Sequence, residues 1–282
     1  MSVPSKFASA AALSLACAGA GNATTITFND FSSVVGLKLN GNSAQVGDVL
    51  RVVPSAPNQS GSVFSTSAVP LASNVSFSTF FRFQISNPGG IGDEDGQGAD
   101  GLAFVVQTVS NTAGGSGGGL GYAGLPKSVA IEFDTFNNCC NIADPNGNHV
   151  GIDLGGSINS VATATEATRF NNGSAWNAWV DYNGATTTLE VRWSLGATRP
   201  TAAQLVQNVN LASELGTPNA FVGFTSGTGS GFNDHDILSW EFRDRFDPVV
   251  TPEPGTFALL AFGLVPLLGR RASAKLKHSV NG

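Results

Sequence analysis

The feature that most restricts the fold of this 282-residue chain is the alternation of apolar and polar side chains along several short stretches. Successive side chains of a β-strand point to opposite faces, so a period of two predicts a strand that buries one face. The stretch 76–85 follows this period, and only Phe80 breaks it. Its apolar phase, and those of two later stretches, are Phe77, Thr79, Phe81, Phe83 and Ile85, then Leu189, Val191 and Trp193, then Leu238, Trp240 and Phe242.

Turn signals separate these stretches. Asn183-Gly184 stands between a run that ends at Tyr182 and one that begins at Ala185, and this dipeptide is a strong hairpin signal because both central residues take positive φ. The 35 glycines and only 12% charged residues suit many short strands joined by tight turns. The segment 202–215 has weak apolar spacing and reads as a connecting loop or a short helical turn. The sequence therefore predicts one large all-β domain, an antiparallel β-sandwich.

Metal-ligand side chains are concentrated near the middle of the chain. Within residues 132–149 lie Glu132, Asp134, Asn138, Asp144 and His149. In a strand, the carboxylates of Glu132 and Asp134 would leave the same face. Calcium prefers oxygen ligands, whereas manganese accepts carboxylates together with an imidazole. The segment predicts a two-metal loop in which Asp134 and Asp144 bridge the ions. An ordinary surface turn, which Asp-Pro-Asn-Gly resembles, is the alternative.

Other motifs occur in a fixed order around this loop. They are Ala99-Asp100-Gly-Leu-Ala-Phe104, the glycine run Gly117 to Gly121, Ser128-Val-Ala-Ile-Glu-Phe-Asp134, Val222-Gly-Phe-Thr-Ser-Gly-Thr228 and His235-Asp-Ile-Leu-Ser-Trp240. Together they resemble the legume-type (L-type) lectin family over residues 25–246. The resemblance implies a concanavalin A-like jelly-roll sandwich at residues 24–247 that binds carbohydrate and is not an enzyme.

The resemblance also assigns the metal ligands. The positions of Glu132, Asp134, Asp144 and His149 would hold a transition ion, usually Mn²⁺. Those of Asp134, the Phe136 main-chain oxygen, Asn138 and Asp144 would hold Ca²⁺. This chain departs from the family pattern between Asn138 and Asp144, where it carries Cys139-Cys140 and a slightly longer segment. In an oxidising exterior the two thiols could form a vicinal bridge, which we favour, remain free or form intermolecular bonds.

The resemblance assigns a sugar pocket as well. It comprises the Asp100 carboxylate after a cis Ala99-Asp100 peptide, the Gly118 main-chain amide and the Asn138 side chain. Phe136 would stack on the sugar ring, with Phe232 as a second candidate. The glycine-rich loop 227–234 would supply a further wall through Asn233 or Asp234, unless it is only a flexible turn. Just ahead of Asp100, the acidic run 93–95 is either a calcium loop or, more simply, a solvated turn.

Two other functions share this sandwich. Retaining glycoside hydrolases need paired carboxyls, and laminarinase-like enzymes use a Glu-x-Asp-x-(x)-Glu run. Here Glu132-Phe-Asp134 is followed by Asn137 and Asn138, so amides replace the second glutamate. This favours binding over hydrolysis. The remaining alternative is a structural matrix or surface protein that binds no glycan.

The two ends of the chain resemble targeting signals. Lys6 and the apolar stretch 7–20 predict a signal peptide at residues 1–23, although Cys17 faintly resembles a lipoprotein attachment site. At 248–282, Pro252-Glu253-Pro254, an uncharged stretch and Arg270-Arg271 resemble the bacterial PEP-CTERM sorting signal. It implies transient membrane anchoring and a sorting peptidase, with a permanent anchor as the alternative.

Charge is consistent with export to a glycan-rich exterior. The 14 basic residues include five in these two segments, which leaves nine in the rest of the chain, where all of the 20 acidic residues except Glu253 lie. Such a domain would repel nucleic acid. We expect a protein that is secreted, or held at the surface of a bacterial cell, with a glycan or exopolysaccharide as its partner. Many relatives form dimers, so a homodimer remains open.

Overall fold

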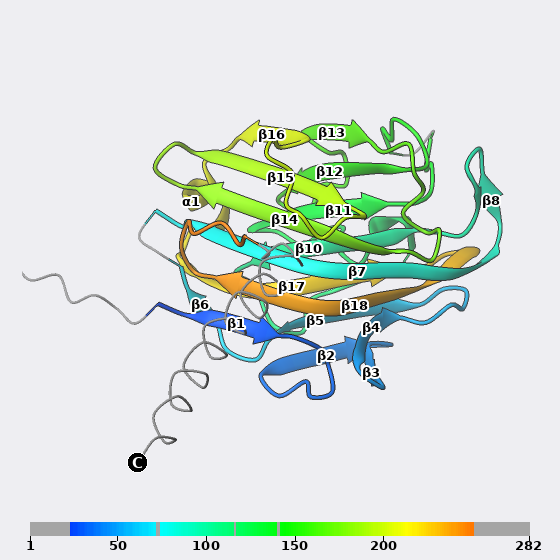
Figure 1. Ribbon diagram of the computed structural model, residues 1–282, viewed down its shortest axis with the longest axis horizontal. Coiled ribbons are helices and arrows are strands. Elements are labelled where there is room, and N and C mark those ends of the chain that lie inside the picture. The colour runs from blue at the N-terminus through cyan, green and yellow to red at the C-terminus, as the bar shows by residue number, and fades with distance from the viewer. Residues whose placement is uncertain (1–22, 72–73, 116, 140–141, 251–282) are drawn as a thin grey trace, which may run out of the picture.

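A computed structural model describes residues 23–71, 74–115, 117–139 and 142–250. Within this part of the chain, two antiparallel β-sheets pack face to face, which confirms the predicted sandwich (Figure 1). The elements in chain order are β1 (Thr25–Phe28), β2 (Leu37–Gly41), β3 (Ala44–Val46), β4 (Val49–Val53), β5 (Ser60–Ser65), β6 (Val69–Pro70), β7 (Phe77–Gly90), β8 (Gly92–Asp93), β9 (Gly96–Gln97), β10 (Gly101–Gln107), the 3₁₀ turn η1 (Gly117–Gly119), β11 (Ser128–Asp134), β12 (His149–Leu154), β13 (Ala162–Thr165), β14 (Ala175–Asn183), β15 (Thr188–Ser194), β16 (Leu205–Asn208), α1 (Leu211–Leu215), β17 (Asn219–Gly227) and β18 (Gly231–Arg243).

Strands that are distant in sequence are neighbours in both sheets. One sheet has the order β16-β15-β14-β7-β18-β4-β3, with β1 added beside β18. The other has the order β13-β12-β11-β10-β17-β5-β2, with β6 added beside β17. The metal-ligand run lies on β11 and β12 of this second sheet. Its position depends on the pairing of the whole sheet and not on a local turn alone.

Phenylalanines fill the space between the sheets. Phe81 of β7 lies 5.1 Å from Phe224 of β17 and 5.8 Å from Phe133 of β11, measured between ring centroids. The predicted inward phase of β7 is confirmed, because Phe77, Thr79, Phe81, Phe83 and Ile85 are all buried. Phe80, which interrupts the alternation, points to the outer face and packs on Trp179 at 5.2 Å.

The opposite face of the second sheet carries a smaller apolar cluster. Its members are Phe64, Ala103, Val105, Tyr122, Leu125 and Ala130. Tyr122 fixes the covering loop, since its hydroxyl accepts hydrogen bonds from Ser128 Oγ and from the Gly156 amide, both at 3.0 Å. This packing holds η1, which contains Gly118, over the sheet that bears Glu132 and Asp134.

The structure corrects three local predictions: the turn at 183–184, the segment 202–215 and the alternation in β18. The 183–184 hairpin exists, but β14 and β15 are joined by the four residues 184–187, and Thr187 rather than Asn183 has the left-handed φ of 54°. Gly184 serves close packing, because a Cβ there would lie 1.7 Å from the Asn74 carbonyl oxygen.

Segment 202–215 contains the predicted short helix as α1, but it also contains strand β16, which the polar residues concealed. In β18 the pairing with β7 shifts between Ile237 and Ser239. Ile237 is therefore the buried residue, and Leu238 is only half-buried. The simple alternation that placed Leu238 in the core fails at this bulge, because a bulge reverses the phase of the side chains.

Every strand of the described residues lies between positions 25 and 243, inside the predicted domain. The predicted signal peptide and sorting segment fall outside the described residues, apart from their inner ends at 23 and 248–250. Among the described residues, no helix has the length and apolar character needed to cross a membrane.

Candidate functional site

Strand pairing creates the centre of the site. Asp134 of β11 lies directly opposite His149 of β12, and Glu132 lies opposite Gly151. Ile131 and Phe133 enter the main core, so Glu132 and Asp134 emerge together on the other face, as predicted. Gly151 makes room for the Glu132 carboxylate, because a Cβ at position 151 would lie 2.2 Å from Glu132 Oε1.

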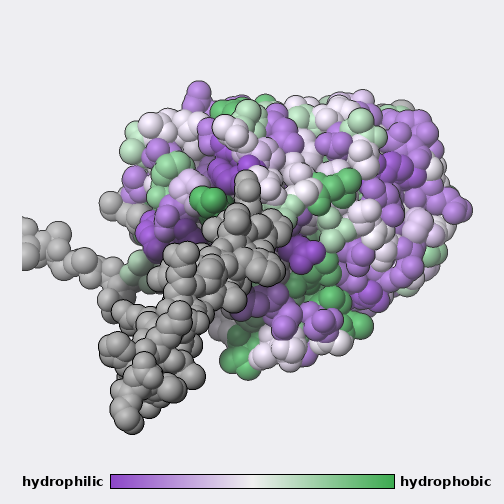
Figure 2. Space-filling model, in the orientation of Figure 1, coloured by the Kyte–Doolittle hydropathy of each residue, from purple (hydrophilic) through white to green (hydrophobic). Residues whose placement is uncertain are grey.

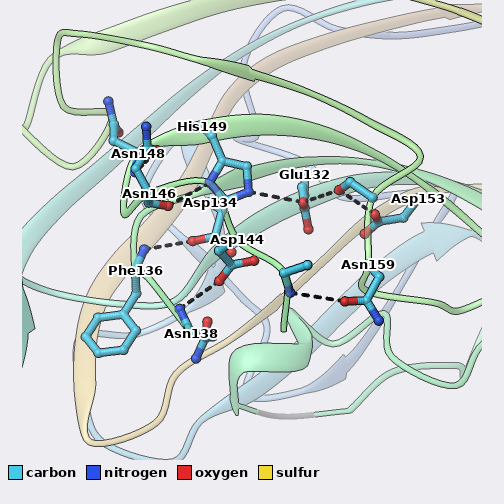
Figure 3. Close-up of polar contacts among 12 residues, drawn as sticks. Glu132, Asp134, Phe136, Asn138, Asp144, Asn146, Asn148, His149, Asp153 and Asn159 are labelled. Carbon is cyan, nitrogen blue, oxygen red and sulfur yellow. Dashed lines mark hydrogen bonds and ion pairs between the residues drawn. The ribbon is translucent and has the colours of Figure 1, made fainter. Parts of the chain in front are cut away.

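The loop between the two strands brings in the other ligand-type groups. Asp134, Asp144 and His149 each present a ligand atom, and these three atoms lie within 4.8 Å of one another. Asp144 Oδ2 accepts a hydrogen bond from the Asn138 main-chain N–H at 2.7 Å, and Asp134 Oδ1 accepts one from the Phe136 main-chain N–H at 2.7 Å (Figure 3). The loop is thus folded around its own carboxylates.

The imidazole of His149 is oriented by the main chain. Its Nδ1 lies 3.0 Å from the Asn146 carbonyl oxygen, which can only accept, so Nδ1 carries a proton. In a neutral ring, Nε2 then presents its lone pair to the carboxylates, with Glu132 Oε1 at 3.4 Å. Two acceptors that face each other repel, unless a proton or a cation lies between them.

Buried negative charge dominates the electrostatics of this cluster. Burial raises the pKa of Asp134 well above its ordinary range, and the nearby carboxylates of Glu132 and Asp144 raise it further. Burial also raises the pKa of Asp144. Among the described residues, no lysine or arginine forms an ion pair with Glu132, Asp134 or Asp144.

These groups fit a pair of divalent cations. The cluster contains three carboxylates without a lysine or arginine partner and one imidazole lone pair. It also contains Asn138 Oδ1, which is buried without a donor among the described residues. This donor set needs positive charge. Carboxylate and amide oxygens suit calcium, and the imidazole suits a transition ion. The fold brings Asp134, Asp144 and His149 together, and their role as metal ligands stays a prediction.

Sequence reasoning missed one side of the cluster. Ser160 Oγ lies 2.6 Å from Glu132 Oε1 and 2.7 Å from Asp153 Oδ1. A hydroxyl has only one proton, so one of these contacts needs a proton from a carboxyl group. Burial, and then the charge of Glu132, raise the pKa of Asp153 to about 9, which favours the proton on Asp153. Alternation from His149 would have placed Asp153 on this face, whereas no sequence signal marks Ser160.

The three residues assigned to a sugar pocket converge beside the cation cluster. The Ala99-Asp100 peptide is cis, as the resemblance implied. Burial raises the pKa of Asp100 to about 7, and Asp144 is close enough to add to this effect. A Cβ on Gly118 would lie 2.7 Å from Asn138 Nδ2, so the Gly118 backbone lies against that amide. Asp100 Oδ2 and Asn138 Oδ1 both lack donors within the described chain.

Phe136 and Phe232 are the two residues predicted to stack on the sugar ring. Phe136 is half-exposed and its ring points away from the carboxylates (Figure 3). The ring of Phe232 lies against the backbone of Gly89 and Gly90, where a Cβ on Gly89 would come within 2.3 Å of it.

Asn233 and Asp234 do not line an open pocket. Asn233 is fully buried, and its Nδ2 donates to the Ser86 carbonyl. Asp234 forms an ion pair with Arg51 at 3.0 Å and accepts hydrogen bonds from Ser55 and Asn87. Protein groups thus already engage Asp234, whereas Asn233 Oδ1 is buried without a donor among the described residues. Both residues stay predicted sugar contacts.

The two remaining sequence features can also be placed. The acidic run 93–95 forms the small β8–β9 hairpin, and Asp93 and Glu94 accept hydrogen bonds from the cation loop. Glu94 and Asp95 are exposed, as expected for a solvated turn, and this turn also contacts the cation loop. Cys139 is exposed, whereas Cys140 lies outside the described residues, so the vicinal bridge stays a prediction.

A jelly-roll sandwich with an acidic, imidazole-containing cluster beside a small polar site defines the class of β-sandwich lectins. The model of the legume lectin domain matches residues 23–254. The chain belongs to the legume lectin domain family. Members of this family bind carbohydrate and are known to bind Ca²⁺ and Mn²⁺, and the domain is non-catalytic.

Individual relatives agree with this assignment. The chain is 33% identical over 225 residues to the L-type lectin-domain containing receptor kinase VIII.1 of Arabidopsis thaliana, covering 76% of this chain and 29% of that protein. It is 36% identical over 183 residues to a seed lectin of Styphnolobium japonicum, covering 61% and 58%. The chain thus spans well under two thirds of the length of either relative.

The fold comparison extends further. The crystal structure of basic winged bean lectin with Tn-antigen superposes with a TM-score of 0.65 at 29% identity, and the match covers 78% of this chain and 98% of that one. The predicted family and the predicted absence of catalysis in this domain are confirmed by these comparisons.

Proposed function

We propose that this domain binds a glycan in a cation-dependent manner through Asp100, Gly118 and Asn138. The observation that carries the proposal is Asp100 Oδ2, a buried acceptor that lacks a donor among the described residues. Sugar hydroxyls are donors of the right kind, because one carboxylate can accept from two neighbouring hydroxyls. The Gly118 amide, beside Asn138, would donate to the same sugar.

The carboxylates explain why cations would be required. Glu132, Asp134, Asp144 and His149 would hold a transition ion such as Mn²⁺, whereas Asp134, the Phe136 carbonyl, Asn138 and Asp144 would hold Ca²⁺. Bound cations supply the positive charge that this buried acidic cluster lacks. With its loop ordered, Asn138 can keep its amide toward the sugar, and Asp100 is held ionised to accept from hydroxyls.

A glycan array run with Ca²⁺ and Mn²⁺, and again with excess chelator, tests this proposal. We expect binding that chelator removes and that added cations restore. Asp100→Ala should abolish glycan binding while it leaves cation binding and the melting temperature close to those of the wild type. Asp95→Ala, which removes an exposed acidic side chain near the site, is the matched control. Normal glycan binding by the Asp100 variant would show that the pocket lies elsewhere.

We also propose the cellular setting that the two ends of the sequence indicate. A protein secreted through residues 1–23 and sorted through residues 248–282 would place this domain at the bacterial surface or in the exopolysaccharide matrix. Exopolysaccharide is then the natural glycan partner. Mass spectrometry of the exported protein tests both signals, since an uncleaved N-terminus, or a protein retained in the cytoplasm, would contradict the proposal.

A further inference from the structure

The β8–β9 hairpin lies at one end of the sandwich, where β8 projects beyond the sheets (Figure 1). Figure 2 shows that hydrophilic residues gather at this end of the molecule. The hairpin carries Asp93 and Glu94 and leads directly into the strand that begins after Asp100. Neither carboxylate belongs to the proposed cation ligands or to the sugar contacts.

Both carboxylates nevertheless bind the cation loop. Asp93 Oδ2 accepts the Asn137 main-chain amide at 2.7 Å. Glu94 Oε1 accepts Asn137 Nδ2 at 2.8 Å and the Gly147 main-chain amide at 3.1 Å. One carboxylate oxygen of Glu94 therefore joins two points that are ten residues apart in the loop.

These two points lie next to proposed ligands. Asn137 is the residue between Phe136 and Asn138, so an anchor at Asn137 fixes two proposed calcium ligands at once. Gly147 follows Asn146, whose carbonyl oxygen orients the imidazole of His149. The hairpin thus holds the first and last parts of the loop at a fixed separation, with Asp144 between them.

The contact is close enough to restrict the side chain at position 147. A Cβ on Gly147 would lie 2.0 Å from Asp93 Oδ2, and its three nearest atoms all belong to Asp93. Gly147 does not have a left-handed φ, so the backbone itself would accept alanine. The hairpin is also fixed from behind, because Arg169 donates to the carbonyl oxygens of Asp95 and Gln97.

We propose that Asp93 and Glu94 are positioning residues that pre-form the cation loop from outside, so that cation affinity depends on two carboxylates that do not touch a cation. This inference rests on the proposed cation-dependent function. Groups that orient metal ligands typically change metal affinity by about 10-fold to 100-fold when they are removed. Here the effect would act by keeping the loop closed before a cation arrives.

Calorimetric titration of the metal-free protein with Mn²⁺ and then Ca²⁺ tests the proposal. Asp93→Ala and Glu94→Ala should each weaken Ca²⁺ affinity by about tenfold. Glu94→Gln should retain affinity near the wild-type value, because a single amide oxygen can accept both of the bonds that Oε1 accepts. Asp95→Ala, which removes the same charge from the same hairpin, should also change nothing.

A double variant tests the contact between Asp93 and Gly147. Gly147→Ala should weaken Ca²⁺ affinity as strongly as Asp93→Ala does, because the added methyl group displaces the Asp93 carboxylate. The combination Asp93→Ala with Gly147→Ala should be no weaker than Asp93→Ala alone, since the obstacle is already gone. Additive losses would contradict the contact, because independent sites add.

Hydrogen exchange of the metal-free protein supplies a readout that needs no cation. The Asn137 and Gly147 amides should exchange about tenfold faster in Asp93→Ala and Glu94→Ala, respectively, with little change in core strands. If wild-type protein binds no cation, the proposed function fails. If it binds cations and the variants bind equally well, only the positioning role fails. A general drop in melting temperature that accounts for the lost affinity would also overturn it.

Discussion

Replacing Asp134 by asparagine should have opposite effects on the metal-free and the cation-loaded protein. Asp134 is only 3% exposed and lies among other carboxylates, and its pKa is raised well above the ordinary range. Asparagine has the same shape without the charge, and its Oδ1 can still accept the Phe136 amide. Without cations, the variant should therefore be at least as stable as the wild type, because it relieves repulsion among buried carboxylates.

With cations present the order should reverse. A ligand at 100 times its dissociation constant stabilises the folded state by about 2.7 kcal/mol. For a domain of this size, each kcal/mol shifts the melting temperature by about 2–4 °C, so cations should raise that of the wild type by about 5–10 °C. The variant lacks a carboxylate that both proposed cation sites share, so it should gain little or nothing.

Differential scanning calorimetry with chelator, and with Ca²⁺ plus Mn²⁺, measures all four melting temperatures. Asp153→Asn is a useful control, because Asp153 lies on the same face but is protonated near neutral pH. It should leave the cation-induced rise largely intact. If Asp134→Asn lowers the melting temperature equally with and without cations, Asp134 serves only the fold and the ligand assignment is wrong.

Other substitutions test separate parts of the molecule. Gly118→Ala places a Cβ 2.7 Å from Asn138 Nδ2 and should weaken glycan binding by about tenfold or more in titration calorimetry, since crowding of this kind costs about 1–3 kcal/mol. Burial lowers the pKa of His235 to about 3, below the 6.5 of an unfolded chain, so acid protonates the unfolded state first. Denaturant melts should therefore show that His235 costs about 2 kcal/mol of stability between pH 8 and pH 5, and His235→Gln should remove this part of the pH dependence. Phe81→Ala should cost about 3–5 kcal/mol of unfolding free energy, because Phe81 contacts two aromatic rings of the opposite sheet.

The fold followed from the sequence wherever a strand buries one face in regular register. β7 buries the apolar residues that were predicted to face the core. Glu132 and Asp134 point to the same face, also as predicted. Prediction failed where the register changes. Because of the bulge in β18, Ile237 is buried in place of Leu238. No local sequence pattern predicts this bulge, because the pairing of β18 with β7 imposes it.

The candidate site also has a part that the sequence could predict and a part that it could not. Its ligand-type residues could be named from one short segment and from family resemblance, because the residue types themselves limit the chemistry. Contacts between distant segments could not. Ser160 reaches Glu132 across 28 residues, and Glu94 reaches Gly147 across 53. The ion pair of Asp234 with Arg51 could not be predicted either, because Arg51 lies 183 residues earlier in the chain.

At the end of strand β11, Ile131 and Phe133 point into the core, and the carboxylates of Glu132 and Asp134 point to the other side. A slip of one position during folding would drive Glu132 and Asp134 into the aromatic interior and expose Ile131 and Phe133 to the acidic loop. Such a mispaired chain would lose its apolar contacts and bury unpaired charge in a single step. Glu132 and Asp134, which are proposed to hold cations, therefore also disfavour a shifted register of β11 during folding.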